Sequence, residues 1–184
     1  VLFRSTIFVE WEGNEMEELN ELQETLRKRR PVEWNQLPDI PLYMDQVLYY
    51  MDRQSIRVDE ADALTSAMVN NYTKGGLVPR ADGKKYSREH LAYLTAICVL
   101  KQVMPAKDMA LLIAKETQGE CSMEEMYGRF CESLDRALAQ AADEMEPYLT
   151  EDQLADGAVH FALLSYAAGV VSRRYVNILR NLEP

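Results

Sequence analysis

The sequence predicts a nearly all-α protein with one short β-hairpin near its middle. Apolar residues recur at three- and four-residue steps along most of the 184-residue chain, which is the spacing of amphipathic helices. Glycine and proline number only 8 and 7, and they gather at a few points between the periodic segments. Hydrophobic residues make up 47% of the chain, which is enough for a core and argues against global disorder.

The N-terminal part is expected to hold two helices joined by an extended connector. Residues 14–30 place acids in the first turns and a basic run in the last, as the helix dipole favours, with Asn14 as the cap. Pro31 ends this helix, and we assign residues 1–36 to an N-terminal helix and linker. Residues 42–54, "LYMDQVLYYMDRQ", form the second, amphipathic helix.

A short helix followed by a hairpin is expected in the middle of the chain. The helix begins at Thr65 or Ser66 and runs to about Lys74, where a Gly-Gly pair supplies a left-handed stop. Residues 78–86, which we call the wing segment, then form the hairpin, with Asp82-Gly83 as its tight turn.

The C-terminal half is expected to be helical. Each helix start carries a capping residue, a proline or a capping box, in which two residues three apart bond each other's backbone N–H groups. The starts are Ser87, Pro105, Ser122 with Glu125, and Thr150 with Gln153. We therefore expect four more helices, the last two forming a pair.

The chain is strongly acidic, but its charge is uneven. A net charge of -10 argues against binding a polyanion over most of the surface. Residues 64–107, however, hold seven basic and two acidic residues, a local charge of +5. The most turn-rich part of this basic segment is residues 70–87, "NNYTKGGLVPRADGKKYS".

This segment has the order of a winged helix-turn-helix. In that arrangement a short helix enters the major groove of DNA and the hairpin contacts backbone phosphates. Lysines beside the turn suit phosphate contact, and exposed asparagines suit adenine edges. The candidate DNA-contacting residues are Ser66, Asn70, Asn71, Lys74, Arg80, Lys84, Lys85 and Tyr86. We assign residues 37–118 to this domain and residues 119–184 to a helical pair for dimerisation or sensing.

Residues 68–113 resemble the reading head of MerR-type regulators. The matching features are Tyr72, Gly76-Leu77, Lys84-Lys85-Tyr86, and Ser87 ahead of two helices. Wing cations in that family touch the DNA backbone, so the resemblance implies the same role for Lys84 and Lys85.

A second resemblance spans about residues 37–115. The segments "LPDIPLYMDQV", "LTSAMVNNYTKGGLVP" and "KKYSREHL" are similar to a bacterial family called domain of unknown function 1836. This resemblance implies a shared architecture and a bacterial origin.

No catalytic residue, metal ligand or cofactor site is expected. The three cysteines, Cys98, Cys121 and Cys131, match no zinc or redox spacing and are interpreted as core residues of a protein in a reducing compartment. His90 and His160 have no partner at metal-ligand spacing and are interpreted as structural. No apolar run approaches the roughly 20 residues of a membrane span.

The leading hypothesis is a cytoplasmic bacterial transcriptional regulator that binds double-stranded DNA. A homodimer is expected because two reading heads raise the affinity of a head with few phosphate contacts. One alternative is a protein-interaction module without DNA binding, since Asn70 and Asn71 stand where MerR-type regulators usually carry an Arg and an aromatic residue. The other is a small-molecule sensor with a pocket between the last two helices. The residues expected to line that pocket are Met126, Phe130, Phe161 and Tyr166.

Overall fold

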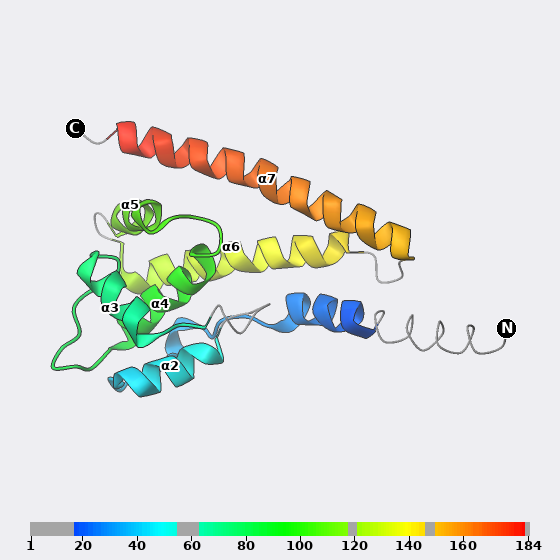
Figure 1. Cartoon of the computed structure of the whole chain (residues 1–184). Helices are drawn as coiled ribbons and strands as arrows, with labels where there is room; N and C mark the ends of the chain where they lie inside the picture. Colours follow the sequence, from blue (N-terminus) through cyan, green and yellow to red (C-terminus); the bar gives the residue numbers. More distant parts are fainter. Residues whose placement is uncertain (1–16, 55–62, 118–120, 146–149, 183–184) are drawn as a thin grey trace. The chain divides into compact units, whose positions relative to one another are not determined.

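The computed structural model describes residues 17–54, 63–117, 121–145 and 150–182, which are predominantly helical (Figure 1). The N-terminal helix covers residues 17–28, and a single 3-10 turn, η1, covers Trp34–Gln36. The other helices are α2 (Met44–Asp52), α3 (Ser66–Lys74), α4 (Arg88–Leu100), α5 (Ala106–Glu116), α6 (Met123–Glu144) and α7 (Glu151–Asn181). The predicted helical class is confirmed, and the predicted cap Asn14 lies outside the described residues.

The residues group into two compact units. The larger unit comprises Arg30–Ser133 and Val171–Pro184, and it therefore includes α2 to α5. The smaller unit comprises Val1–Arg29 and Leu134–Val170. Both units draw on α6 and α7, so neither is one continuous stretch of chain. The division at residues 36 and 118 stays a prediction.

Helix α4 lies at the centre of the larger unit. Eight of its residues are buried, and Leu91, Leu94 and Ile97 have no exposed surface. A helix that is apolar on several sides requires neighbours on several sides. Side chains from α2, α3, α5 and α6 pack in the same core, among them Val47, Met51, Val69, Met109 and Tyr127.

The predicted hairpin wing is reduced to one tight turn. Among the described residues there are isolated bridges but no strand, and the bridge within the wing segment joins Asp82 to Lys85. Tyr86, the next residue along, exchanges both backbone hydrogen bonds with Leu42, at 2.8 and 2.9 Å. Because Tyr86 is already paired outside the wing segment, the hairpin does not extend to it. The turn is centred on Gly83 and Lys84, one residue later than predicted.

The predicted ends of α3 are confirmed. Thr65 is the N-cap, and its hydroxyl accepts a backbone N–H of the first turn at 3.2 Å. At the other end Gly76 has φ +74°, the left-handed conformation that glycine adopts readily. Gly76 N–H donates to the Thr73 carbonyl, and Leu77 N–H donates to the Tyr72 carbonyl at 2.9 Å. This pair of bonds is a Schellman motif, which leaves few free carbonyls at the helix end.

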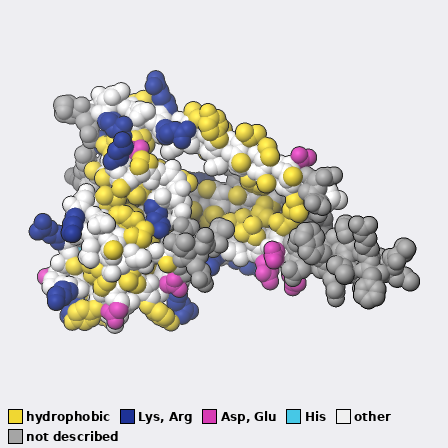
Figure 2. All heavy atoms as spheres, viewed as in Figure 1, with side chains coloured by type: hydrophobic (Ala, Val, Ile, Leu, Met, Phe, Trp, Pro, Cys, Tyr) yellow, Lys and Arg dark blue, Asp and Glu magenta, His cyan; other side chains and the backbone are white. Residues whose placement is uncertain are grey.

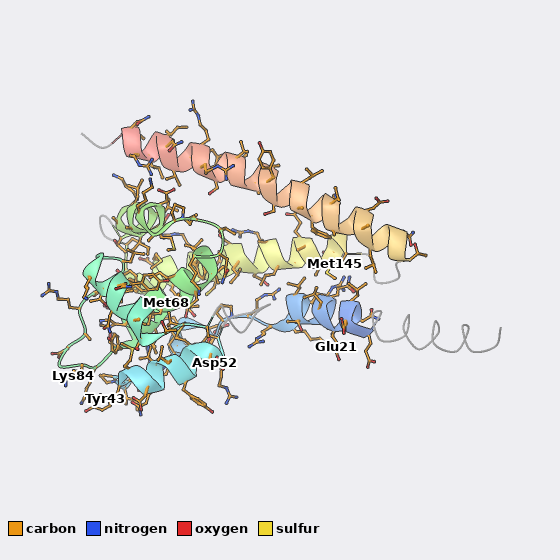
Figure 3. The ribbon with its side chains drawn as sticks, in the orientation of Figure 1. Glu21, Tyr43, Asp52, Met68, Lys84 and Met145 are labelled. Carbon is orange, nitrogen blue, oxygen red and sulfur yellow. The ribbon has the colours of Figure 1, made fainter. Side chains whose placement is uncertain are left out.

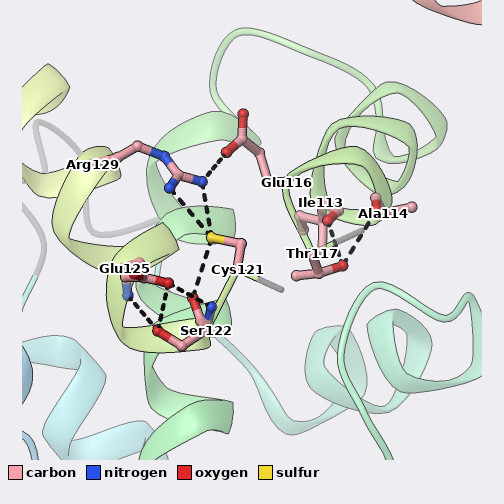
Figure 4. A network of polar contacts seen from close by, with 8 residues as sticks. All are labelled: Ile113, Ala114, Glu116, Thr117, Cys121, Ser122, Glu125 and Arg129. Carbon is pink, nitrogen blue, oxygen red and sulfur yellow. Dashed lines mark hydrogen bonds and ion pairs between the residues drawn. The ribbon is translucent and has the colours of Figure 1, made fainter. Parts of the chain in front are cut away.

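Helix α6 begins with the predicted capping box (Figure 4). Ser122 N–H donates to Glu125 Oε2 at 2.8 Å, and Glu125 N–H donates to Ser122 Oγ at 3.2 Å. The Ser122 N–H lowers the pKa of the Glu125 carboxyl because it stabilises the charged form. Arg129, one turn further on, pairs with Glu116 at 2.6 Å and contacts Cys121 Sγ at 3.2 Å. Cys121 is therefore partly exposed rather than a core residue.

The smaller unit joins the N-terminal helix to the end of α6 by polar contacts. Gln23 Nε2 donates to the carbonyls of Ala142 and Met145, at 2.8 and 3.2 Å. These carbonyls lie at the C-terminal end of α6, where the helix itself supplies no donor, so Gln23 acts as a cap from another helix. Arg27 pairs with Asp143 at 3.1 Å, with both side chains largely exposed.

Helix α7 is long, apolar and largely exposed. It runs without a break through Gly157 and Gly169. By length and composition alone, Gln153–Asn181 is apolar enough to cross a membrane, because its most apolar window has a mean hydropathy of 1.5. None of the residues in its most apolar window is buried.

Candidate nucleic-acid interface

Helix α3 presents a polar face to solvent. Four of the predicted contact residues form one arc of this helix at steps of one, three and four residues, and all four are exposed: Ser66, Asn70, Asn71 and Lys74. The opposite face is anchored in the core, where Val69 has no exposed surface and Tyr72 packs against buried side chains. Since both ends are capped and one face is buried, the polar arc is held in a fixed orientation.

The tight turn presents two lysines, Lys84 and Lys85. Both are exposed, and Figure 3 shows Lys84 at the tip of the turn. Gly83 and Lys84 have φ of +52° and +74°, and consecutive positive φ values are the mark of a type I′ turn. Lys84 is the only residue other than glycine with positive φ in the described part of the chain. A left-handed conformation costs a residue with a Cβ about 1–2 kcal/mol.

The turn is attached to the starts of two helices. Lys85 Nζ lies 5.6 Å from the ring centre of Tyr43, the N-cap of α2, a cation–π distance. His90 Nδ1 accepts the backbone N–H of Ser87 at 3.0 Å, and its Nε2 lies 3.4 Å from the Arg80 carbonyl. The tautomer with hydrogen on Nε2 satisfies both nitrogens. His90 is therefore structural, and it links the wing segment to the first turn of α4.

Tyr86 differs from the other predicted contact residues. Its exposed fraction is 6%, and its ring meets the His90 ring edge to face at 5.5 Å between centroids. The side chain lies in the core beneath the turn, and the interpretation of Tyr86 as a DNA contact stays a prediction. The exposed candidate set is Ser66, Asn70, Asn71, Lys74, Arg80, Lys84 and Lys85.

The exposed cations of this interface have no acidic partner among the ion pairs of the described residues. These cations are Lys74, Arg80, Lys84 and Lys85. Figure 2 shows Lys and Arg side chains projecting from the part of the molecule that contains α3 and the wing segment. A phosphate could therefore contact these side chains without displacing a carboxylate of the described part of the chain.

A separate apolar cavity lies in the smaller unit. Its volume is about 650 Å³, within the usual range for small-molecule sites. The N-terminal helix contributes Leu19, Leu22 and Leu26, and Phe161 on α7 faces them. Its polar lining residues are Glu144, Gln153, Asp156 and His160. Of the four residues predicted to line a pocket, Phe161 does so, whereas Met126, Phe130 and Tyr166 are not among the lining residues.

Sequence reasoning did not find the role of Leu42 and Tyr43. Leu42 holds the backbone of Tyr86, and Tyr43 lies under Lys85. The aromatic residue at the start of a predicted helix was visible, but nothing local indicates which distant cation it meets. Of the two tyrosines, the exposed one beside the turn is Tyr43, at 49%, while Tyr86 is buried.

Fold and site together define a predominantly helical protein with an exposed polar helix beside a basic tight turn. The family model described as Domain of unknown function (DUF1836) matches residues 32–130, more than half of the chain, and the protein belongs to this family. The match includes α2 to α5 and every residue of the candidate interface. No curated protein and no solved structure matches the chain.

Proposed function

We propose that the protein is a cytoplasmic bacterial transcriptional regulator that binds double-stranded DNA in the manner of a MerR-like winged helix-turn-helix. Helix α3 enters the major groove, and the tight turn of the wing segment contacts phosphates. The observation that carries the proposal is the arrangement of α3 and the turn. There, exposed cations that have no acidic partner among the described residues flank an anchored polar helix face.

The basic and the amide side chains are proposed to have different roles in DNA binding. Lys84, Lys85 and Arg80 supply sequence-independent contacts to phosphate. Asn70 and Asn71 carry amide groups, which can donate to N7 and accept from N6 of adenine in the major groove. The net charge of -10 repels DNA elsewhere, so binding is restricted to this surface.

Fluorescence anisotropy with labelled random-sequence duplexes across a potassium chloride series tests the phosphate contacts. The native chain is expected to bind at low salt, and its affinity should fall linearly with salt on a log–log plot. Replacing two phosphate-contacting lysines, Lys84→Asn with Lys85→Gln, should make the slope shallower by about 1.8, since each contact contributes about 0.9. Asn is chosen at position 84 because it tolerates positive φ.

The matched control is Lys107→Gln with Arg173→Gln, which removes the same charge from exposed positions outside the interface. Absence of binding at low salt would refute the proposal and favour the protein-interaction module. Equal losses in the control pair would show that net charge, rather than this surface, governs binding. Asn70→Ala should change the preferred sequence in a duplex selection while leaving the salt slope unchanged.

A second candidate function, small-molecule sensing, is favoured by the cavity of the smaller unit. Its lining is mostly apolar, so a ligand with an apolar surface would bury that surface and the pocket walls on binding. The probe is 1-anilinonaphthalene-8-sulfonate, a fluorophore with an apolar aromatic body and one sulfonate group. Leu22→Trp, which fills the cavity, should weaken its binding, whereas Glu21→Trp on the same helix should not. Equal binding by both variants would exclude the site.

A further inference from the structure

A seven-residue apolar repeat runs along the whole of α7. Its first members, Leu154, Gly157 and Phe161, line the cavity of the smaller unit. The repeat continues with alternating steps of three and four residues through Leu164, Ala168, Val171, Tyr175, Ile178 and Leu182. We call these six residues the α7 stripe. A strict seven-residue repeat is the pattern of a helix that packs lengthwise against another helix.

The α7 stripe lies in solvent. Tyr175 is 65% exposed and Leu182 is 71% exposed, and hydrophobic side chains are visible along α7 in Figure 2. The helix contacts the larger unit by a different face, where Val176 is 3% exposed and Arg180 pairs with Asp108 at 2.7 Å. Within the larger unit, the stripe is therefore not the side by which α7 packs.

We propose that the α7 stripe is covered by the same stripe of a second copy of this chain, packed antiparallel across a two-fold axis near residue 173. This inference concerns assembly and does not depend on DNA binding. Around that axis, Val171 lies opposite Tyr175 of the second copy, and Ala168 lies opposite Ile178. These two pairs each join a larger side chain to a smaller one, and Leu164 lies opposite Leu182, so the layers are filled, as close packing requires. A parallel arrangement would stack Tyr175 on itself and leave an underfilled layer at Ala168.

The charges beside the stripe permit this self-association. Across the seam, residues 164–172 of one copy, which contain no Asp, Glu, Lys or Arg, face residues 174–182 of the other copy, so few like charges meet. Arg174 is the charged residue that flanks the stripe near the axis, where it would face its own copy. Salt screens such a repulsion, so dimerisation is expected to strengthen with ionic strength. DNA binding has the opposite salt dependence.

The area of the stripe is consistent with a dimer. Each of its six side chains presents on the order of 100 Å², so two copies would bury on the order of 1,000 Å², the level that a specific interface reaches. A membrane is a poorer match for α7. The 16 uncharged residues 157–172 span about 24 Å as a helix, which is shorter than a hydrocarbon core of about 30 Å.

Sedimentation analysis of the full chain over a micromolar concentration series tests the proposal. The native chain should have twice the mass of one chain, and Ile178→Lys, on the stripe, should be monomeric. The control is Leu163→Lys, which changes a side chain of 62% exposure on another face of α7 and should remain dimeric. Circular dichroism verifies that both variants keep their helix. A monomeric native chain, or equal loss of dimer in both variants, would overturn the proposal.

Cross-linking tests the antiparallel orientation. In a background of Cys121→Ser and Cys131→Ala, a short bismaleimide should join a chain with Leu164→Cys to a chain with Leu182→Cys. Neither variant alone should cross-link. Cross-linking of Leu182→Cys to itself would refute the antiparallel seam. If the native chain floats with phosphatidylcholine vesicles as a monomer, the proposal is refuted, and the α7 stripe binds a membrane surface instead of a second copy.

Discussion

Lys84→Gly is expected to make the protein more stable and, at the same time, a weaker DNA binder. Lys84 has φ +74°, and the tight turn around it is closed by two backbone hydrogen bonds between Asp82 and Lys85, at 3.1 and 2.8 Å. Neither bond involves the Lys84 side chain. The substitution therefore removes a strained Cβ and an exposed cation while leaving the turn itself intact.

The change in stability follows from two opposing terms. The left-handed conformation costs lysine about 1–2 kcal/mol, and glycine removes this strain. Glycine gains more conformational freedom on unfolding than lysine does, which lowers the free energy of unfolding by about 0.5–1 kcal/mol. The net stabilisation is about 0.5–1 kcal/mol, which raises the melting temperature by about 1–4 °C for a chain of this length. In urea, the midpoint should rise while the slope of the transition stays unchanged.

The change in binding follows from the loss of one phosphate contact. The salt slope of DNA affinity should become shallower by about 0.9. Lys85→Gln is the matched control, because it removes an exposed cation whose φ is not positive. That variant should lose the same binding without the gain in stability. A destabilised Lys84→Gly chain would refute the strain argument, and unchanged DNA affinity would refute the role of Lys84 in binding.

Three further predictions concern the larger unit. His90→Ala should lower the free energy of unfolding by about 1–2 kcal/mol, because the first turn of α4 loses the side chain that accepts the Ser87 N–H. His90→Gln keeps an acceptor at this position and should retain most of the stability. Urea unfolding of the two variants measures the difference. Tyr127→Phe should lower stability by about 1–2 kcal/mol in the same assay, since the Tyr127 hydroxyl donates to the Val32 carbonyl at 2.8 Å and phenylalanine leaves that oxygen unpaired. The folded-state pKa of Glu125 is lowered, so its contribution to the free energy of unfolding is fully present above its unfolded pKa and is lost as the pH falls through the folded pKa. Glu125→Gln should therefore reduce the dependence of the unfolding free energy on pH in the acid range. An unchanged dependence would contradict this.

Helix ends were predicted from sequence because they depend on neighbours in the chain. Thr65 caps a backbone N–H three residues away, and the capping box of Ser122 and Glu125 spans the same interval. The left-handed stop at Gly76 likewise needs only a residue without a Cβ. The exposed arc of α3 followed from the helical period, since Asn70 lies on the side away from the buried Val69.

The wing segment depended on tertiary structure. Tyr86 pairs with Leu42, which lies 44 residues earlier in the chain, and that pairing removes it both from the hairpin and from the surface. Lys85 meets Tyr43 for the same reason. The strain at Lys84 is a property of the folded backbone, and it cannot be predicted from the residue type at this position. The sequence pattern was enough to predict cations at the turn. Long-range packing determines which aromatic residue lies beneath them.

Helix α7 shows most clearly which features follow from the sequence and which follow from tertiary structure. The recurrence of apolar residues at three- and four-residue steps is a property of the sequence, and it was sufficient to predict a helix starting at Thr150. Which face attaches to the rest of the chain was decided by tertiary structure, where Val176 is buried and Tyr175 beside it is exposed. The physical reason is that periodicity arises within one helix, whereas burial depends on the surfaces that other segments bring to it.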